Sequence, residues 1–174
     1  MKMRTVLGLS TAMMLVVLAG GAALAATLTG TEGPDELQGT PNADEIYGLG
    51  GRDEINGGGG RDKVFGGEGG DNKYSGLRGG PNNDTVSGGP GNDFITGDSG
   101  ADRLLGGPGD DYIDFEEVPG EQADFYSGGG GDDFIESDDR PADKDFVRCG
   151  AGLDTAYVDR KDEVGRDCEK TRLP

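Results

Sequence analysis

The chain has 174 residues, of which 36 are glycine, 34 are acidic and 16 are Lys or Arg, and it contains no histidine. The formal net charge of −18 at pH 7 argues against nucleic acids and anionic membrane surfaces as partners, because like charges repel. Without histidine the chain lacks the most common general base and the most common ligand of zinc and copper. We therefore expect neither an enzyme nor a site for those metals.

The first 25 residues have the pattern of a Sec-type signal peptide. Two cations, Lys2 and Arg4, precede a nearly continuous apolar stretch over residues 6–18, and residues 23–25 form an Ala-x-Ala cleavage site. An uncleaved anchor helix is the alternative, since the apolar stretch approaches the length that spans a membrane. No cysteine lies near the cleavage site, which argues against a lipoprotein. We expect cleavage after Ala25 and secretion of residues 26–174, with no stable membrane insertion afterwards.

From residue 30 onward the chain is built on a nine-residue repeat. Residues 48–74 read GLGGRDEIN, GGGGRDKVF and GGEGGDNKY, and residues 79–114 read GGPNNDTVS, GGPGNDFIT, GDSGADRLL and GGPGDDYID. The pattern is G-G-x-G-x-D-x-U-x, in which U is a large apolar residue. Thirteen units can be aligned, and their sixth position is Asp35, Asp44, Asp53, Asp62, Asp71, Asp84, Asp93, Asp102, Asp111, Asp124, Asp133, Asp145 and Asp154.

The eighth position of the units is apolar with one exception. It is occupied by Leu37, Ile46, Ile55, Val64, Lys73, Val86, Ile95, Leu104, Ile113, Tyr126, Ile135, Val147 and Ala156. The polar exception, Lys73, comes just before a four-residue insert that we place at residues 75–78. Two further inserts are expected at residues 115–118 and 137–139.

Each unit is expected to fold as a six-residue turn and a three-residue strand, whose alternation places U on one face. Strands this short can stack as a parallel β-solenoid with two units per coil, so that unit n lies over unit n+2. We expect this all-β fold over residues 26–157, with no helix after the leader, because dense glycine disfavours helices. A flexible glycine-rich linker would not hold Asp and U in phase over such a length, and collagen needs glycine at every third position.

One apolar residue per unit makes a core too thin to hold the solenoid alone. Stacking also brings the Asp of one turn close to the Asp of the turn above it, where the two carboxylates repel. Calcium meets both requirements, because it takes six to eight oxygen ligands and glycine-rich turns expose carbonyl oxygens. Magnesium demands tighter octahedral geometry and keeps its water, so it fits such a turn less well.

The repeat resembles the haemolysin-type (RTX) calcium-binding repeat family over about residues 30–157. The resemblance implies a parallel β-roll that binds several Ca²⁺ ions between successive turns. It implies sixth-position carboxylates as ligands, which here are Asp35, Asp44, Asp53, Asp62, Asp71, Asp84, Asp93, Asp102, Asp111 and Asp133. It also implies turn carbonyls, here of Gly48, Gly50, Gly57, Gly59, Gly66, Gly88, Gly106 and Gly128. Three aspartates are left out because their turns, PGEQAD, RPADKD and CGAGLD, have lost many of their glycines: Asp124, Asp145 and Asp154.

The C-terminal tail, residues 158–174, is expected to act as a cap. The two cysteines, Cys149 and Cys168, favour a disulfide in an exported protein over two free thiols or a metal pair. The tail is similar to the ends of small exported calcium-repeat proteins in which a cysteine pair closes the last coil. The chain departs from the family's larger members, which leave the cell through a C-terminal signal and carry a toxin, protease or lipase domain.

Two functions follow from these expectations. The first is a secreted calcium-binding protein whose β-roll folds when several Ca²⁺ ions bind. The second is a calcium-dependent extracellular adhesion or interaction module that binds a protein or glycan. The second would use aromatic residues that precede U: Phe94, Tyr112 and Phe134 on one outer face, and Phe125 and Phe146 on the other. An ice-binding solenoid would need a flat threonine ladder, and only Thr31 and Thr40 share a position in the turns.

Overall fold

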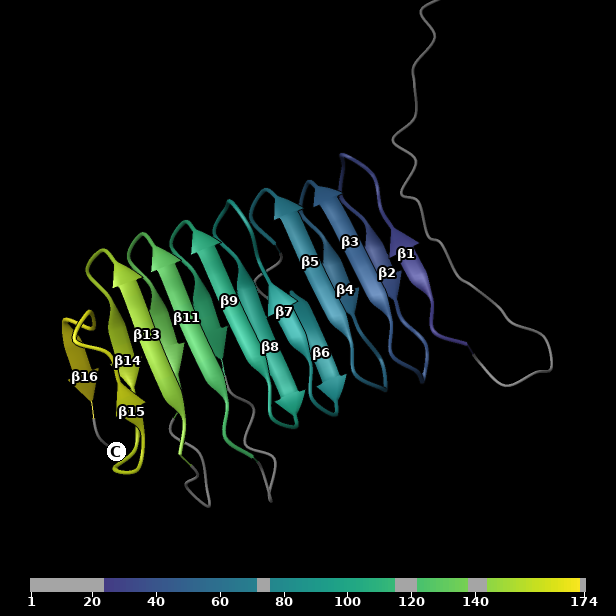
Figure 1. The fold of residues 1–174 in the computed structure, drawn as a ribbon. Helices are drawn as coiled ribbons and strands as arrows, with labels where there is room; N and C mark the ends of the chain where they lie inside the picture. The colour runs from purple at the N-terminus through teal and green to yellow at the C-terminus, as the bar shows by residue number, and fades with distance from the viewer. Residues whose placement is uncertain (1–23, 72–75, 115–121, 138–143, 173–174) are drawn as a thin grey trace, which may run out of the picture.

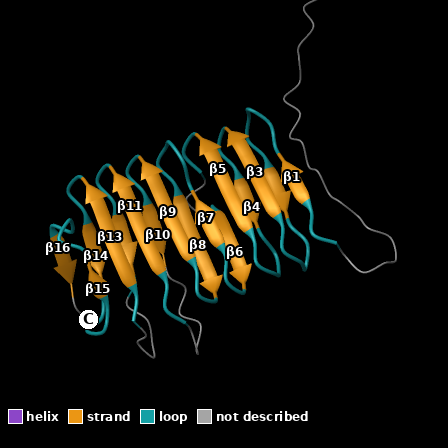
Figure 2. Ribbon diagram, viewed as in Figure 1, coloured by secondary structure: helices purple, strands orange, loops and turns teal. Residues whose placement is uncertain are grey.

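The structure is a computed structural model that describes residues 24–71, 76–114, 122–137 and 144–172. The predicted signal peptide apart from its last two residues, Lys73, the insert at residues 115–118 and most of that at residues 137–139 lie outside these ranges. Within the described residues no helix is long and apolar enough to cross a membrane. Figure 2 shows these residues as strands and loops only.

In the described part of the chain, sixteen short strands form two parallel sheets of eight strands each, stacked along one axis (Figure 1). The first sheet contains, in spatial order, β1 (Thr27–Thr29), β3 (Glu45–Gly50), β5 (Lys63–Glu68), β7 (Thr85–Ser87), β9 (Arg103–Pro108), β11 (Phe125–Gly130), β13 (Phe146–Ala151) and β15 (Glu163–Val164). The second sheet contains β2 (Glu36–Gln38), β4 (Glu54–Asn56), β6 (Leu77–Pro81), β8 (Phe94–Ser99), β10 (Tyr112–Asp114), β12 (Phe134–Glu136), β14 (Thr155–Tyr157) and β16 (Lys170–Arg172).

Successive strands alternate between the two sheets, so each strand pairs with the strand two places along the chain. The register joins equivalent positions of the repeat: Leu28 pairs with Ile46, and Val64 pairs with Val86. Two units therefore make one coil, and the predicted parallel β-solenoid is confirmed.

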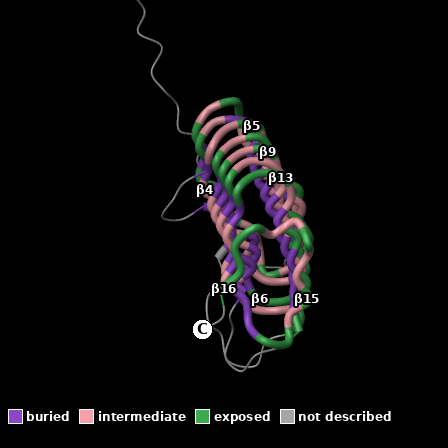
Figure 3. The backbone as a smooth tube through the Cα atoms, turned by 90° about the vertical axis from the view of Figure 1, so that its left-hand side faces the viewer, coloured by how far each residue is buried: buried purple, intermediate pink, exposed green. Residues whose placement is uncertain are grey.

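The core is a double line of apolar side chains between the sheets. The burial view, turned by 90°, shows buried positions on the facing inner sides (Figure 3). The core contains Leu28, Leu37, Ile46, Ile55, Val64, Leu77, Val86, Ile95, Leu104, Ile113, Tyr126, Ile135, Val147, Cys149, Ala156 and Val158. Each strand contributes chiefly its U residue, because side chains alternate between the two faces of a strand.

The first insert is placed wrongly by the nine-residue count. The count put Lys73 at a core position and residues 75–78 in an insert. In the structure Leu77 pairs with Ile55 and is fully buried, and Arg78 pairs with Asn56 in the same strand pair. The extra residues therefore lie between Asp71 and Leu77, where they leave the apolar line unbroken.

Strands β1, β15 and β16 extend the sheets beyond the thirteen aligned units. Strand β1 adds Leu28 to the N-terminal end of the core, and β15 and β16 pair with β13 and β14 at the other end. Most of the C-terminal tail thus continues the solenoid as a further coil.

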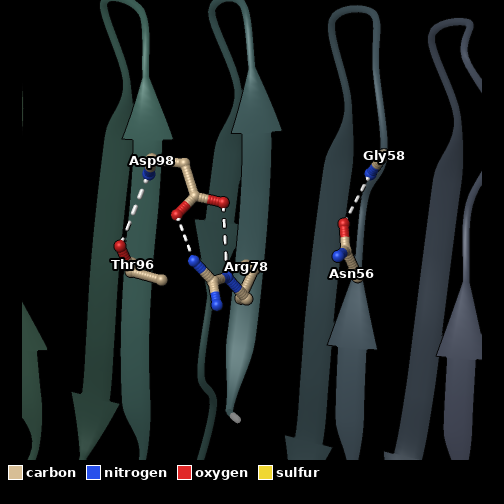
Figure 4. A network of polar contacts seen from close by, with 5 residues as sticks. All are labelled: Asn56, Gly58, Arg78, Thr96 and Asp98. Carbon is tan, nitrogen blue, oxygen red and sulfur yellow. Dashed lines mark hydrogen bonds and ion pairs between the residues drawn. The ribbon is translucent and has the colours of Figure 1, made fainter. Parts of the chain in front are cut away.

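Glycine is needed at the second and fourth positions of the turn for a conformational reason. Left-handed φ angles recur there, as at Gly58 (95°) and Gly60 (109°), and such angles are costly for residues with a Cβ. Asp98 stands at a second position with a φ of 65°. Its carboxylate accepts from Arg78 at 2.7 Å across the coils, and its amide N–H donates to Thr96 Oγ1 at 3.4 Å (Figure 4). These contacts hold Asp98 in a conformation that glycine adopts freely elsewhere.

Candidate metal-binding turns

Thirteen aspartates close the turns of the solenoid and are buried, with at most 5 % of their surface exposed. They form two rows that run along the stack. The Asp35 row, which leads into the second sheet, comprises Asp35, Asp53, Asp71, Asp93, Asp111, Asp133 and Asp154. The Asp44 row, which leads into the first sheet, comprises Asp44, Asp62, Asp84, Asp102, Asp124 and Asp145. The thirteen predicted positions are therefore brought together in two lines.

Within each row, one carboxylate oxygen is used by the neighbouring coil. The amide N–H of Asp53 donates to Oδ1 of Asp71 at 2.7 Å, and that of Asp84 donates to Oδ1 of Asp102 at 2.7 Å. The same bond joins every consecutive pair in both rows, at 2.6 to 2.9 Å. The three aspartates in glycine-poor turns, Asp124, Asp145 and Asp154, take part in the same kind of bond, so they belong to the rows as well.

The other carboxylate oxygen has no hydrogen-bond partner in most turns. Oδ2 is buried and unpaired at Asp53, Asp62, Asp71, Asp84, Asp93, Asp111, Asp133 and Asp154. Native proteins rarely leave buried polar atoms unpaired, because the lost hydration is then not replaced. A recurring orphaned oxygen in the same place of the repeat therefore indicates a partner other than a protein donor.

The orphaned oxygen faces a space kept open by glycine at the first position of each turn. A Cβ added to Gly79 would lie 2.8 Å from Oδ2 of Asp84 and 2.8 Å from the carbonyl oxygen of Gly97 in the next coil. A row carboxylate oxygen and a next-coil carbonyl oxygen converge in the same way at Gly48, Gly57, Gly66, Gly88, Gly106 and Gly128, where Cys149 supplies the carbonyl in the last case. Converging oxygens without a donor between them fit a hard cation.

The predicted ligands Gly50 and Gly59 differ from the other glycines. They stand at the third position, and a Cβ at Gly59 would meet only atoms of Pro41, at 3.5 Å or more. No row carboxylate is among the nearest atoms at Gly50 or Gly59. The structure therefore groups the first-position glycines with the aspartates. At the third position a Cβ has room at Gly59, whereas at Gly50 it would lie 3.2 Å from Oε2 of Glu32.

The donor set fits calcium better than a transition metal. No group of three or more His, Cys, Asp or Glu side chains that could hold one ion is found within the described ranges. A site in these turns would therefore combine row carboxylates with backbone carbonyls, which is the oxygen-only chemistry that Ca²⁺ takes. The assignment of individual ligands stays a prediction.

Burial makes several of the inner row carboxyls hard to ionise without a cation. Desolvation, with repulsion from row neighbours, raises the pKa of Asp84 and Asp111 to about 8, although backbone hydrogen bonds partly oppose the shift. Desolvation likewise raises the pKa of Asp71 to about 7 and those of Asp53 and Asp62 to about 6. The rows thus bring carboxylates together in a buried environment that disfavours their charged form.

Both rows continue into the C-terminal tail, which the repeat pattern did not reveal. Asp145 donates its amide N–H to Oδ1 of Asp162 at 3.2 Å, and Asp154 donates to Oε2 of Glu169 at 3.1 Å. These acids follow their partners by 17 and 15 residues, where a regular coil has 18, and glycine-rich turns do not precede them. In the sequence, only the acidic side chains of Asp162 and Glu169 indicate that they belong to the rows.

The predicted disulfide is confirmed. Cys149 and Cys168 are bonded, with their Cα atoms 5.0 Å apart, and the bond joins β13 to the segment that leads into β16.

Removing metal should make the fold depend on pH. The carboxyls of Asp53, Asp62, Asp71, Asp84 and Asp111 have pKa values near 6 to 8 when folded and about 3.9 when unfolded, so their protonation favours the folded state. This stabilisation is fully present below about pH 4 and is lost as the pH rises through the folded-state values. In metal-free buffer, urea unfolding followed by circular dichroism should show falling stability from about pH 5 to about pH 8.

Saturating calcium should flatten this trend, because Ca²⁺ then occupies the oxygens that would bind protons. The apparent calcium dissociation constant of the folded protein should rise as the pH falls, because protons and Ca²⁺ compete for the same oxygens, whereas less calcium should be needed for folding because protonation already favours the folded state. A metal-free protein whose stability is constant, or rises, over the same pH range would contradict the burial of these carboxyls.

Comparison with known families finds one match. The RTX calcium-binding nonapeptide repeat (4 copies) matches residues 20–55, 29–64, 38–72, 78–113 and 120–139, which together cover more than half of the chain. No curated protein and no solved structure shows a match to this sequence.

Proposed function

The chain belongs to the RTX calcium-binding nonapeptide repeat family, and on that premise we propose that it is a secreted protein whose β-roll folds when several Ca²⁺ ions bind its turns. The observation that carries the proposal is the row of buried Oδ2 oxygens without a donor. The row carboxylates and the next-coil carbonyls would hold the ions. Ca²⁺ would supply the positive charge that both rows lack.

We propose secretion because residues 1–25 have the pattern of a signal peptide. The calcium concentration outside cells is also high enough to fill sites of the affinity expected here. Extracellular calcium modules have dissociation constants of about 10⁻⁴ to 10⁻³ M. At roughly 1 mM free Ca²⁺, a site with a dissociation constant of about 10⁻⁴ M adds about 1.4 kcal/mol to the stability of the folded state. Several such sites decide between folded and unfolded chains, whereas micromolar Ca²⁺ would add almost nothing. We propose a binding role without catalysis.

Chelation should unfold the protein reversibly. We expect far-UV circular dichroism of residues 26–174 to show an expanded chain in EGTA, because the unneutralised rows repel and their oxygens lose their partners. Millimolar CaCl₂ should restore the β-sheet spectrum, and equal MgCl₂ should restore much less of it. Identical spectra in EGTA and in calcium would rule out this function.

A methyl group in the cation space should remove one site. Gly88 faces Oδ2 of Asp93 and the carbonyl of Gly106, so we expect Gly88→Ala to raise the calcium midpoint and to cost at least about 2 kcal/mol in calcium. The matched control is Gly59→Ala, at a third position with open space. It should be neutral or stabilise the fold by about 0.4–1 kcal/mol. Equal losses in both variants would show that the turn tolerates no side chain anywhere and that the first position is not special.

A second candidate function uses the outer face of the second sheet. Phe94, Tyr112 and Phe134 stack there as predicted, with ring centroids 4.9 Å apart at each step. They border a groove of about 530 Å³ that is also lined by Asn92, Asp110 and Asp132. These last residues form an outer ladder, in which the amide N–H of Asp132 donates to Oδ1 of Asp110 at 2.8 Å. The groove therefore combines aromatic rings with an acidic edge.

Charge complementarity favours a basic partner for this groove. On the opposite sheet, the guanidinium of Arg103 lies 4.2 Å from the ring centre of Phe125, and Lys144 lies 5.0 Å from that of Phe146. Such cation–ring contacts are favourable, and an acidic edge strengthens the attraction. We propose that an Arg- or Lys-rich segment of an extracellular protein binds here once calcium has folded the sheet.

An oligoarginine peptide tests this second function. Fluorescence anisotropy in calcium should show binding that falls about tenfold in the double variant Phe94→Ala/Phe134→Ala, equivalent to about 1.4 kcal/mol. The control is Tyr47→Ala/Phe65→Ala, which removes another stacked pair, 5.0 Å apart, on the first sheet. Equal affinities for both variants would mean that only the net charge attracts the peptide.

A further inference from the structure

The first turn of each row provides its own donors to the carboxylate. The amide N–H and Oγ1 of Thr31 donate to Oδ2 of Asp35, at 2.5 and 3.0 Å. The amide N–H of Thr40 donates to Oδ2 of Asp44 at 2.5 Å, and its Oγ1 donates to Oδ1 at 3.1 Å. The oxygen that is orphaned in the inner turns is therefore satisfied by the chain itself in these two turns.

The two threonines stand at the second position, where most later turns have glycine with a left-handed φ. Thr31 and Thr40 lie outside the left-handed region. Their backbone amides consequently point at their own turn's carboxylate, and the side-chain hydroxyl adds a second donor. The orphaned atom of Asp35 is Oδ1, the oxygen that elsewhere accepts from the preceding coil. Its partner is missing because Asp35 is the first member of its row.

The C-terminal end of the Asp44 row has an equivalent arrangement. Ser137 takes the first position, as shown by its amide N–H, which donates to the carbonyl of Tyr157 at 2.8 Å, just as Gly39 donates to Asn56. The hydroxyl of Ser137 lies within hydrogen-bond distance of two acceptors, the carbonyl oxygen of Tyr157 at 3.2 Å and Oδ2 of Asp162 at 3.3 Å. That same oxygen accepts from the amide N–H of Asp159 at 2.7 Å. A hydroxyl group thus occupies the space that glycine leaves open in the inner turns.

We propose that the calcium ladder is bounded by these residues: the carboxylates of Asp35 and Asp44 accept threonine donors of their own turns, that of Asp162 faces the hydroxyl of Ser137 from the preceding coil, and these three carboxylates bind no ion. Calcium then binds only the inner turns, whose Oδ2 atoms lack a donor. The inference rests on the calcium-binding function proposed above and specifies where the binding stops. It also removes Asp35 and Asp44 from the ligands that the family resemblance implied.

The physical reason is competition between donors and a cation for one oxygen. A carboxylate that already accepts two N–H or O–H bonds has its charge partly compensated. An ion at the same oxygen would have to displace those bonds and would face donor hydrogens that carry positive partial charge. Next-coil carbonyl oxygens lie near the row carboxylates in the first turns and in the inner turns alike. The inner Oδ2 atoms have no donor that an ion would have to displace, whereas those of Asp35 and Asp44 accept from Thr31 and Thr40.

Native mass spectrometry of residues 26–174 in saturating calcium measures the number of bound ions. Asp44→Asn and Asp84→Asn are matched variants, because both remove one carboxylate from the same row. We expect Asp44→Asn to keep the wild-type number and a calcium midpoint within about twofold of wild type. Asp84→Asn should lose at least one ion and fold only at higher calcium.

A gain of ions tests the same inference from the opposite direction. The double variant Thr31→Gly/Thr40→Gly removes the hydroxyls and permits the left-handed φ, so it should bind more ions than the wild type. Thr31→Ser/Thr40→Ser keeps both hydroxyls and should match the wild-type number.

The results separate the two proposals. If wild-type protein binds several ions and Asp44→Asn loses as many as Asp84→Asn, the bounded ladder is wrong while the calcium-binding function stands. An unchanged ion number in the glycine double variant, provided that it folds, also counts against the bounded ladder. If the wild-type protein binds no calcium, the function itself fails.

Discussion

The structure depends on how two rows of buried carboxylates are neutralised. In each row, Oδ1 accepts the amide N–H of the previous coil, as between Asp53 and Asp71, and this bond uses the donor that the stacked turn offers. Oδ2 is left facing a carbonyl oxygen of the next coil. A stack of such turns accumulates negative charge at every coil in a place with little water. Protons or cations must therefore enter the rows before the strands can remain paired.

The repeat motif divides its work between strand and turn. The strand needs one apolar residue, and the thin core that results leaves much of the stability to the turn. Within the turn, the first position must be small because two oxygens converge there, whereas the second and fourth positions need left-handed φ angles. The third position meets neither requirement, which explains why Glu68, Pro90 and Pro108 are accepted there. The glycines of the pattern G-G-x-G thus have two different causes: the first must be small, and the second and third must adopt left-handed φ angles.

The sequence predicted the fold, the two aspartate rows and the disulfide, because each depends on spacing or on residue type alone. It misplaced the insert after Asp71, since counting by nine cannot show where a longer turn rejoins the sheet. Only the pairing of Leu77 with Ile55 shows that point. The row members Asp124 and Asp145 were discounted for want of glycine, although the bond that builds a row needs an amide and a carboxylate and no glycine. Asp162 was missed because it follows Asp145 by 17 residues, whereas a regular coil has 18.

Chemically distinct ends solve a problem that every regular repeat creates. Equivalent units could pair one coil out of register and still align aspartate with aspartate and U with U, so the inner units specify the register only weakly. Thr31 and Thr40 occur only at the first turns, and the bond between Cys149 and Cys168 occurs only at the last coil. Slipped pairing would place a threonine-closed turn against an inner carboxylate, or would leave β16 without its partner. The disulfide closes a loop worth about 3 kcal/mol whatever the calcium concentration. The ends therefore distinguish the correct register from the slipped ones, and the inner turns stabilise the pairing that the ends specify.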